Sequence, residues 1–189
     1  GFKNLRQYGG LSGFPKREES PCDAYDTGHS STSISAGVGY VCASKVSGEE
    51  YHVVSVIGDG ALTGGMAYEA LNNAASLNKN FVIVLNDNKM SISENVGGIS
   101  SYLSNLRTAE SYTDLKSEVK KTLNKVPGIG PAMVQRIHKT KDSIKQLMIP
   151  GMFFEDMGIK YLGPVNGHDC GRMIQVFQEA KKVNGPVLV

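Results

Sequence analysis

The fold is decided by two stretches of sequence, VIGDGALTGGMAYEALN at residues 56–72 and VLNDNKMSISENVGG at residues 84–98. Apolar runs of strand length lead into both, at residues 51–57 and 81–85. Residues 63–77 between them predict a helix, because apolar side chains recur at spacings of three and four. These apolar positions are Met66, Ala70, Leu71 and Ala74. A strand, a crossover helix and a second strand form a parallel, right-handed unit, so both strands end at the ligand-binding edge of the sheet.

The residues that follow the two strands predict a site for a divalent cation and a diphosphate. Gly58 and Gly60 offer a turn whose backbone N–H groups bind phosphate, but Asp59 between them repels an anion. Mg²⁺ removes this conflict, because it prefers oxygen ligands shared between protein and phosphate. Asp59 supplies a carboxylate oxygen, Asn88, 29 residues later, an amide oxygen, and Met90 a backbone carbonyl oxygen.

Two other interpretations of the glycine turn remain open. A dinucleotide-binding turn needs the pattern G-x-G-x-x-G and an acid at the end of the next strand. Here the third glycine, Gly64, comes one residue too late, and amides flank Asp87 at the end of the next strand. The turn could also use glycine only for its backbone geometry. The spacing of Asp59 and Asn88 favours the Mg²⁺-diphosphate site over both.

Three further motifs extend this pattern along the chain. They are GLSGFPKREES at residues 10–20, TGHSSTSISAG at 27–37 and GPVNGHD at 163–169. Together with the first two stretches, they resemble the 1-deoxy-D-xylulose-5-phosphate synthases, which are thiamine diphosphate enzymes of the transketolase-like group. The similarity covers nearly the whole chain. One departure is Asn166, where this family usually has aspartate, which argues against a charged role at that position.

The resemblance implies an α/β fold of three layers, with a mostly parallel sheet and helices on both faces. It implies thiamine diphosphate and Mg²⁺ as cofactors, with the metal held by Asp59, Asn88 and Met90. It implies cofactor contacts from Gly28, His29, Ser30, Gly58, Gly60, Ala61 and Asn88. The catalytic residues stay unknown, because the family's glutamate for the aminopyrimidine ring belongs to a following domain.

The resemblance also implies a reaction. Members of this family condense pyruvate with glyceraldehyde 3-phosphate to 1-deoxy-D-xylulose 5-phosphate and release CO₂, the first step of the non-mevalonate isoprenoid pathway. We expect a transferase that acts as a homodimer in the cytoplasm. Transketolase and the E1 component of a 2-oxo-acid dehydrogenase share the glycine turn and the asparagine, and are the alternative enzymes.

The chain of 189 residues suits one domain. The resemblance implies that this domain, residues 1–189, is incomplete at both ends and inactive alone. A helical, mobile insertion is expected at about 101–150, with helices at 112–124 and 132–148. Elsewhere the pattern predicts helices at residues 34–46 and 169–183. It predicts strands at residues 159–162 and 186–189. Small residues of the first helix, Ala36, Gly37, Gly39 and Ala43, are expected to pack on the sheet, and Ser or Thr to cap its start. Asp169 is expected to cap the later helix.

A different class of function is suggested by residues 126–137, which resemble the helix-hairpin-helix of DNA-binding proteins. We favour a solvated hairpin here, because a second hairpin is missing and acids offset the lysines. The net charge of +2 and the apolar share of 40% also argue against a nucleic-acid or membrane surface. Cys22, Cys42 and Cys170 form no CxxC pair, so we expect reduced thiols, buried as small apolar side chains.

Overall fold

The computed structural model describes residues 2–88, 90, 96–108 and 152–189, and structural statements below refer to these residues. They form a parallel sheet of four strands in the order β1-β2-β4-β3. The strands are β1 (Val54–Gly58), β2 (Phe81–Asn86), β3 (Lys160–Tyr161) and β4 (Pro186–Leu188). This confirms the α/β class and the parallel strand–helix–strand unit, although β1 begins later than the predicted segment at 51–57.

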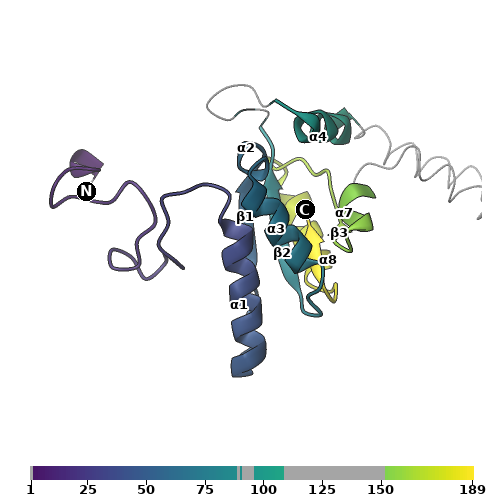
Figure 1. Cartoon of the computed structure of the whole chain (residues 1–189), viewed down its shortest axis with the longest axis horizontal. Coiled ribbons are helices and arrows are strands. Elements are labelled where there is room, and N and C mark those ends of the chain that lie inside the picture. Colours follow the sequence, from purple (N-terminus) through teal and green to yellow (C-terminus); the bar gives the residue numbers. More distant parts are fainter. Residues whose placement is uncertain (1, 89, 91–95, 109–151) are drawn as a thin grey trace, which may run out of the picture.

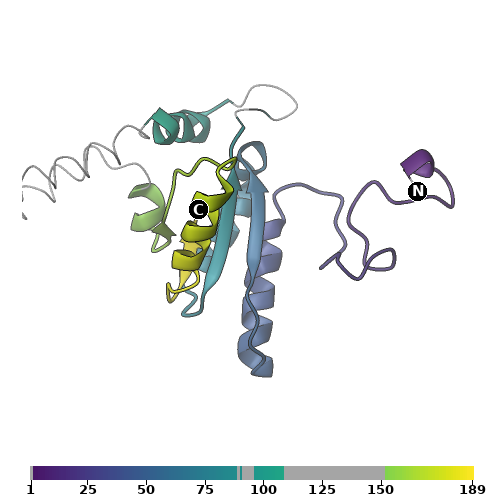
Figure 2. The ribbon, with the colours of Figure 1, turned by 180° about the vertical axis from the view of Figure 1, so that it is seen from behind.

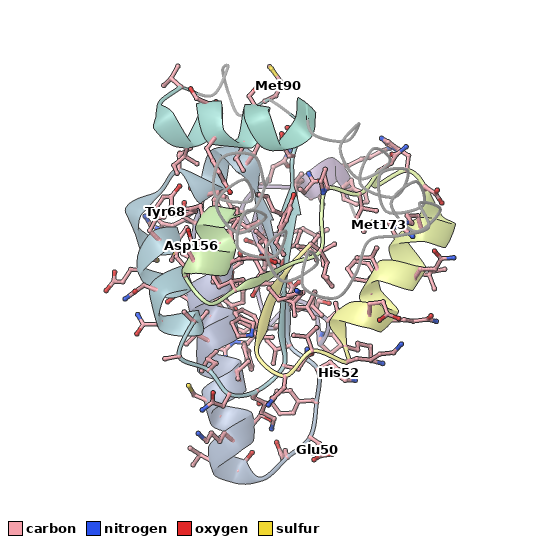
Figure 3. The ribbon with its side chains drawn as sticks, turned by 90° about the vertical axis from the view of Figure 1, so that its right-hand side faces the viewer. Glu50, His52, Tyr68, Met90, Asp156 and Met173 are labelled. Carbon is pink, nitrogen blue, oxygen red and sulfur yellow. The ribbon has the colours of Figure 1, made fainter. Side chains whose placement is uncertain are left out.

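Helices cover both faces of this sheet, which confirms the three-layer prediction. Helices α1 (Ser33–Ser47) and α3 (Gly65–Ala74) lie on one face, and α8 (Cys170–Ala180) lies on the other (Figures 1 and 2). Figure 3 shows the sheet between the two helical layers. Each face has its own apolar core: Ile34, Leu71, Phe81 and Ile83 belong to the first, and Val82, Ala180 and Val187 to the second.

Helix α1 approaches the sheet closely at Gly37. A side chain at Gly37 would collide with the Ser55 hydroxyl and with the ring of Phe81. Gly39 and Ala43 lie on the opposite, exposed side of the helix, so the prediction that they also contact the sheet is wrong. Thr32 is the N-cap residue, but its hydroxyl makes no capping bond and donates instead to the carbonyl of His29 at 3.3 Å.

The predicted helix at residues 63–77 is divided into two shorter helices. A four-residue helix α2 (Asp59–Leu62) follows β1 directly, and α3 begins at Gly65 after a break at Thr63 and Gly64. Met66 therefore lies at the start of α3 and is 51% exposed, contrary to the prediction that it faces the core. Four other residues form the buried stripe of α3: Ala67, Ala70, Leu71 and Ala74.

The C-terminal elements match their predicted order. Asp169 caps α8 as expected, because its Oδ1 accepts a hydrogen bond from the backbone N–H of Arg172 at 2.9 Å. Asn80, just before β2, joins the far end of α8 to the sheet. Its side-chain Nδ2 donates to the carbonyls of Ala180 and Val183, each at 2.8 Å.

Among the described residues, three helices lie outside the individual helices predicted: the short 3-10 helix η1 (Phe2–Asn4), α4 (Gly98–Thr108), which overlaps the start of the expected helical insertion, and α7 (Met152–Asp156). Aromatic rings hold α4 and α7 together: Tyr102 of α4 lies edge-on to Phe153 and Phe154 of α7, with ring centroids 5.7 and 5.9 Å apart. Phe154 also stacks on Tyr161 of β3. The predicted helices at 112–124 and 132–148, and the hairpin at 126–137, lie outside the described residues.

All three cysteine thiols are exposed, so the expectation that they are buried is wrong. Cys42 lies on the outer side of α1, Cys170 begins α8, and Cys22 belongs to the segment before α1. None of them forms a disulfide. Across the part of the chain that the structure describes, every helix is too short or too polar to cross a membrane.

Candidate functional site

Asp59 lies where β1 ends and α2 begins, at the carboxyl edge of the sheet. Its side chain is buried, with 2% of the residue exposed, although aspartate is among the residues that are rarely buried without partners. Gly58 pairs with Asn86 across the two strands. The residues that follow this pair, Asp59 and Asp87, are therefore neighbours at the same edge.

Asp59 and Asp87 interact through their carboxyl groups. Burial is the main cause that raises the pKa of Asp59, and a side-chain hydrogen bond with Asp87 and the negative charge of Asp87 raise it further. The backbone N–H of Gly60 opposes this by donating to the charged form. Two adjacent carboxyl groups favour holding a proton or a cation, because two negative charges so close together are costly. The arrangement therefore fits a hard divalent cation.

Sequence analysis gave Asp87 no role at this site. The signal that could have found it is the strand register. Once Gly58 is aligned with Asn86, the next residue of each strand must lie side by side. The ends of β1 and β2 were both predicted, but the pairing of their residues was not.

Asn88 and Met90, the other predicted metal ligands, follow β2 in a tight turn. The Asn88 Oδ1 accepts a hydrogen bond from the Met90 backbone N–H at 3.0 Å. Both residues are exposed, in contrast to Asp59. Within residues 2–88, 90, 96–108 and 152–189, no three His, Cys, Asp or Glu side chains cluster as a metal site. The available donors are carboxylate, amide and carbonyl oxygens, the ligand types that Mg²⁺ accepts.

The predicted cofactor residues Gly28, His29 and Ser30 lie exposed in the segment just before α1. The next residue, Ser31, fastens this segment to α2, because its hydroxyl donates to the carbonyl of Ala61 at 2.6 Å. A side chain at Gly64 would collide with Ser31, so the two segments approach closely. The structure thus fixes Ser31, the residue after the predicted cofactor segment 28–30, against Ala61, which sequence analysis assigned to the same cofactor.

A cavity of about 620 Å³ opens beside this site, over the ends of β2, β3 and β4. Its polar lining comes from Asn86, Asp87, Asn88, Tyr161, Asn166 and His168. Asp59 and residues 28–30 do not line it, whereas Asp87 and the predicted metal ligand Asn88 do. Burial raises the pKa of Tyr161, with smaller contributions from Tyr102 and from the charge of Asp87.

The loop at residues 163–169 forms one wall of the cavity. The Asn166 Oδ1 accepts a hydrogen bond from the backbone N–H of His168 at 3.0 Å, which holds the loop in a turn. His168 is therefore a turn residue of this loop, and sequence analysis did not place it near Asn88. Both residues line the cavity.

Comparison with known proteins gives a consistent result. A family model described as 1-deoxy-D-xylulose-5-phosphate synthase matches residues 1–189. Proteins named 1-deoxy-D-xylulose-5-phosphate synthase from Lachnoclostridium phytofermentans and Carboxydothermus hydrogenoformans are 58% and 56% identical over 188 residues. One from Clostridium botulinum is 57% identical over 189 residues. Each match covers 100% of this chain but 30% of the relative, so the chain spans about 30% of their length.

Proposed function

Because the chain belongs to the 1-deoxy-D-xylulose-5-phosphate synthase family, we propose that it is part of a longer enzyme, here called the parent protein. The proposed reaction joins pyruvate to glyceraldehyde 3-phosphate, releases CO₂ and yields 1-deoxy-D-xylulose 5-phosphate. The observation that carries this proposal is the buried Asp59 beside Asp87, the residue before Asn88, at the edge where parallel sheets bind ligands. An identity of 58% over the whole chain supports it.

The proposed role of this chain is to hold Mg²⁺ and the diphosphate of thiamine diphosphate. Asp59, Asn88 and the carbonyl of Met90 would hold the metal. Gly58, Gly60 and Ala61 would present backbone N–H groups to the phosphates. The segment of Gly28, His29 and Ser30 would contact the same cofactor from the other side, since Ser31 fixes it against Ala61.

When bound, thiamine diphosphate supplies the electron sink that makes the loss of CO₂ from pyruvate possible. The residues of this chain would bind and orient the diphosphate end of the cofactor. With Mg²⁺ bound, Asp59 would stay negatively charged, because the cation would offset the charge that a proton neutralises in its absence. The glutamate that tunes the aminopyrimidine ring is expected outside residues 1–189. We therefore assign no proton transfer to a residue of this chain.

The parent protein is proposed to act as a homodimer in the cytoplasm, with pyruvate and glyceraldehyde 3-phosphate as its substrates. Transketolase and the E1 component of a 2-oxo-acid dehydrogenase are less favoured, because the three relatives described above all carry the synthase name. The proposed function does not require binding to nucleic acid.

Isothermal titration of the parent protein with thiamine diphosphate, with and without Mg²⁺, tests this function. Asp59→Asn removes the proposed charged ligand but keeps the size of the side chain. In the presence of Mg²⁺, the affinity of this variant for thiamine diphosphate should fall by more than ~10–100-fold. A fall of that size is typical when only a residue that supports a metal ligand is lost, and Asp59 is proposed as a ligand itself. CO₂ release from the two substrates should fall in parallel.

Asp156→Asn is the matched control, because Asp156 is exposed at the end of α7. This variant should bind cofactor and release CO₂ like the unmodified protein. Unchanged Mg²⁺-dependent affinity in Asp59→Asn would reject the metal assignment. Normal binding without any product from pyruvate and glyceraldehyde 3-phosphate would reject the proposed reaction while keeping the site.

A further inference from the structure

The dipeptide Asn-Gly occurs at two places in the chain, Asn166-Gly167 and Asn184-Gly185. In this dipeptide the side-chain amide of asparagine is open to attack by the backbone nitrogen of the next residue, because glycine has no Cβ to hinder the approach. The attack converts asparagine to an acidic residue without an enzyme. In a folded protein the local backbone decides whether the reaction proceeds, so the two places can be compared.

The first dipeptide lies in a loop that leaves room for this reaction. Asn166 and Gly167 are both exposed, so water reaches them. Apart from its chain neighbours, nothing lies within 4 Å of a Cβ built on Gly167. The Asn166 carbonyl accepts a hydrogen bond from the backbone N–H of Asp169 at 3.0 Å, which closes a turn over the dipeptide.

A hydrogen bond to the side chain of Asn166 also prepares the attack. Its Oδ1 accepts from the backbone N–H of His168 at 3.0 Å. When the nitrogen of Gly167 attacks Cγ of Asn166, negative charge develops on this Oδ1. A backbone donor that is already in place there stabilises the charge as in an oxyanion hole. The same bond holds the amide over the turn, so less freedom is lost on reaction.

The second dipeptide is held differently. Gly185 is buried, and its φ is +123°. Its carbonyl accepts the backbone N–H of Phe81 at 3.3 Å, and Pro186, the next residue, begins β4. Attack on Asn184 requires the Asn-Gly backbone to rotate, which would disturb the junction of β2 and β4. The fold therefore opposes the reaction at Asn184.

We propose that Asn166 is a site of spontaneous deamidation in the folded protein and that Asn184 is not. The nitrogen of Gly167 bonds to Cγ of Asn166 and gives its proton to water. The bond from Cγ to Nδ2 breaks, and Nδ2 takes up a proton and leaves as ammonia. Water then opens the cyclic imide. Addition at Cγ gives aspartate, and addition at the backbone carbonyl of residue 166 gives isoaspartate.

Both products place a negative charge in the wall of the cavity that Asp87 and Asn88 also line. Asparagine supplies no charge at this position, so the cavity becomes more acidic as the protein ages. Isoaspartate also lengthens the backbone just before Asp169, the residue that caps α8. The proposal depends on the loop alone, so it can be tested without Mg²⁺, thiamine diphosphate or substrates.

The test is a time course with the parent protein at neutral pH and physiological temperature, in the native state and in urea. Peptides that contain residues 166 and 184 are analysed by chromatography and mass spectrometry, which separate the asparagine, aspartate and isoaspartate forms. In the native protein Asn166 should react at least about tenfold faster than Asn184, a difference of about 1.4 kcal/mol in the barrier. In urea the two should react at similar rates, because Asn184 no longer needs local opening.

Gly167→Ala is the matched variant, because the added methyl group hinders the attack and has open space around it. Deamidation of Asn166 should become at least about tenfold slower in this variant, while Asn184 keeps its rate. An Asn166 that stays intact in the native protein, or reacts no faster than Asn184, would overturn the proposal. An unchanged rate in Gly167→Ala would also overturn it. If this variant does not fold, the comparison of Asn166 with Asn184 in the unmodified protein decides.

Discussion

The hydroxyl of Ser31 donates a 2.6 Å hydrogen bond to the carbonyl of Ala61, and so joins two segments that are 30 residues apart. One of these segments carries Gly28, His29 and Ser30, and the other follows Asp59. The bond is partly buried. It fixes the position of two groups of proposed cofactor residues relative to each other, although neither Ser31 nor its bond was assigned by sequence analysis.

Ser31→Ala in the parent protein should lower the free energy of unfolding by about 1 kcal/mol, the usual net contribution of one hydrogen bond. It should also weaken the binding of thiamine diphosphate, because the segment of residues 28–30 loses its attachment. Ser35→Ala is the control, since Ser35 is exposed on α1. Denaturant titration and calorimetry measure both effects. Equal affinity in the two variants would contradict a positioning role for Ser31.

Gly37 and Gly39 form a matched pair on α1. Gly37→Ala should destabilise the protein by about 1–3 kcal/mol, because the added methyl group meets Ser55 and Phe81 in a packed core. At Gly39 nothing lies within 4 Å of an added Cβ, and alanine there should stabilise the helix by up to about 1 kcal/mol. Thermal unfolding of the two variants measures the difference. Similar melting temperatures would show that α1 does not pack on the sheet as described.

The stability of the metal-free protein should depend on pH through Asp59. Its pKa is raised in the folded state, chiefly by burial. Between the ordinary carboxyl pKa and this raised value, the folded state binds more protons than the unfolded state. The free energy of unfolding therefore falls as pH rises through that window, and the penalty is complete above it. Mg²⁺ affinity should rise across the same window, because the cation competes with the proton.

Thermal unfolding in EDTA, from mildly acidic to neutral pH, measures this dependence. Asp59→Asn cannot ionise, so its stability should fall less with rising pH than that of the unmodified protein. At neutral pH without metal it should be the more stable of the two. If the stability of both proteins changed with pH in the same way, Asp59 would already be charged in the metal-free protein, with its charge balanced by other groups.

Asn80→Ala should remove both hydrogen bonds that join the end of α8 to the start of β2. The carbonyls of Ala180 and Val183 lose their donor, so we expect a loss of about 1–3 kcal/mol in the free energy of unfolding. Asn78→Ala is the control, because Asn78 is exposed two residues earlier. Chemical denaturation followed by circular dichroism measures the difference. An equal effect of the two substitutions would contradict the bridging role.

The strand–helix–strand unit could be predicted because apolar periodicity is a local property of the sequence. Asp59 and Asn88 could be selected because their residue types and spacing carry the chemistry. The contact between Asp59 and Asp87 could not be predicted, because it depends on the register in which β1 pairs with β2. Met66 was placed in the core because the break at Gly64 was not recognised, and that break puts Met66 in the exposed first turn of α3.

Helices α4 and α7 were missed for a different reason. Their packing depends on rings from distant parts of the chain, Tyr102, Phe153, Phe154 and Tyr161, which no local pattern connects. The cysteines were expected to be buried from the average behaviour of the residue. Their exposure follows from their positions in the segment before α1, on the outer side of α1 and at the first residue of α8.

The contact between Tyr102 and Phe153 has a consequence for protein engineering. Their ring centroids are 5.7 Å apart, so α4, which ends at Thr108, and α7, which begins at Met152, are in contact. The entropy of closing a loop grows only slowly with its length, so two such adjacent points tolerate connections of very different size. A short linker, an affinity tag or a fluorescent domain could therefore replace residues 109–151 and report on the parent protein while leaving the strand order intact.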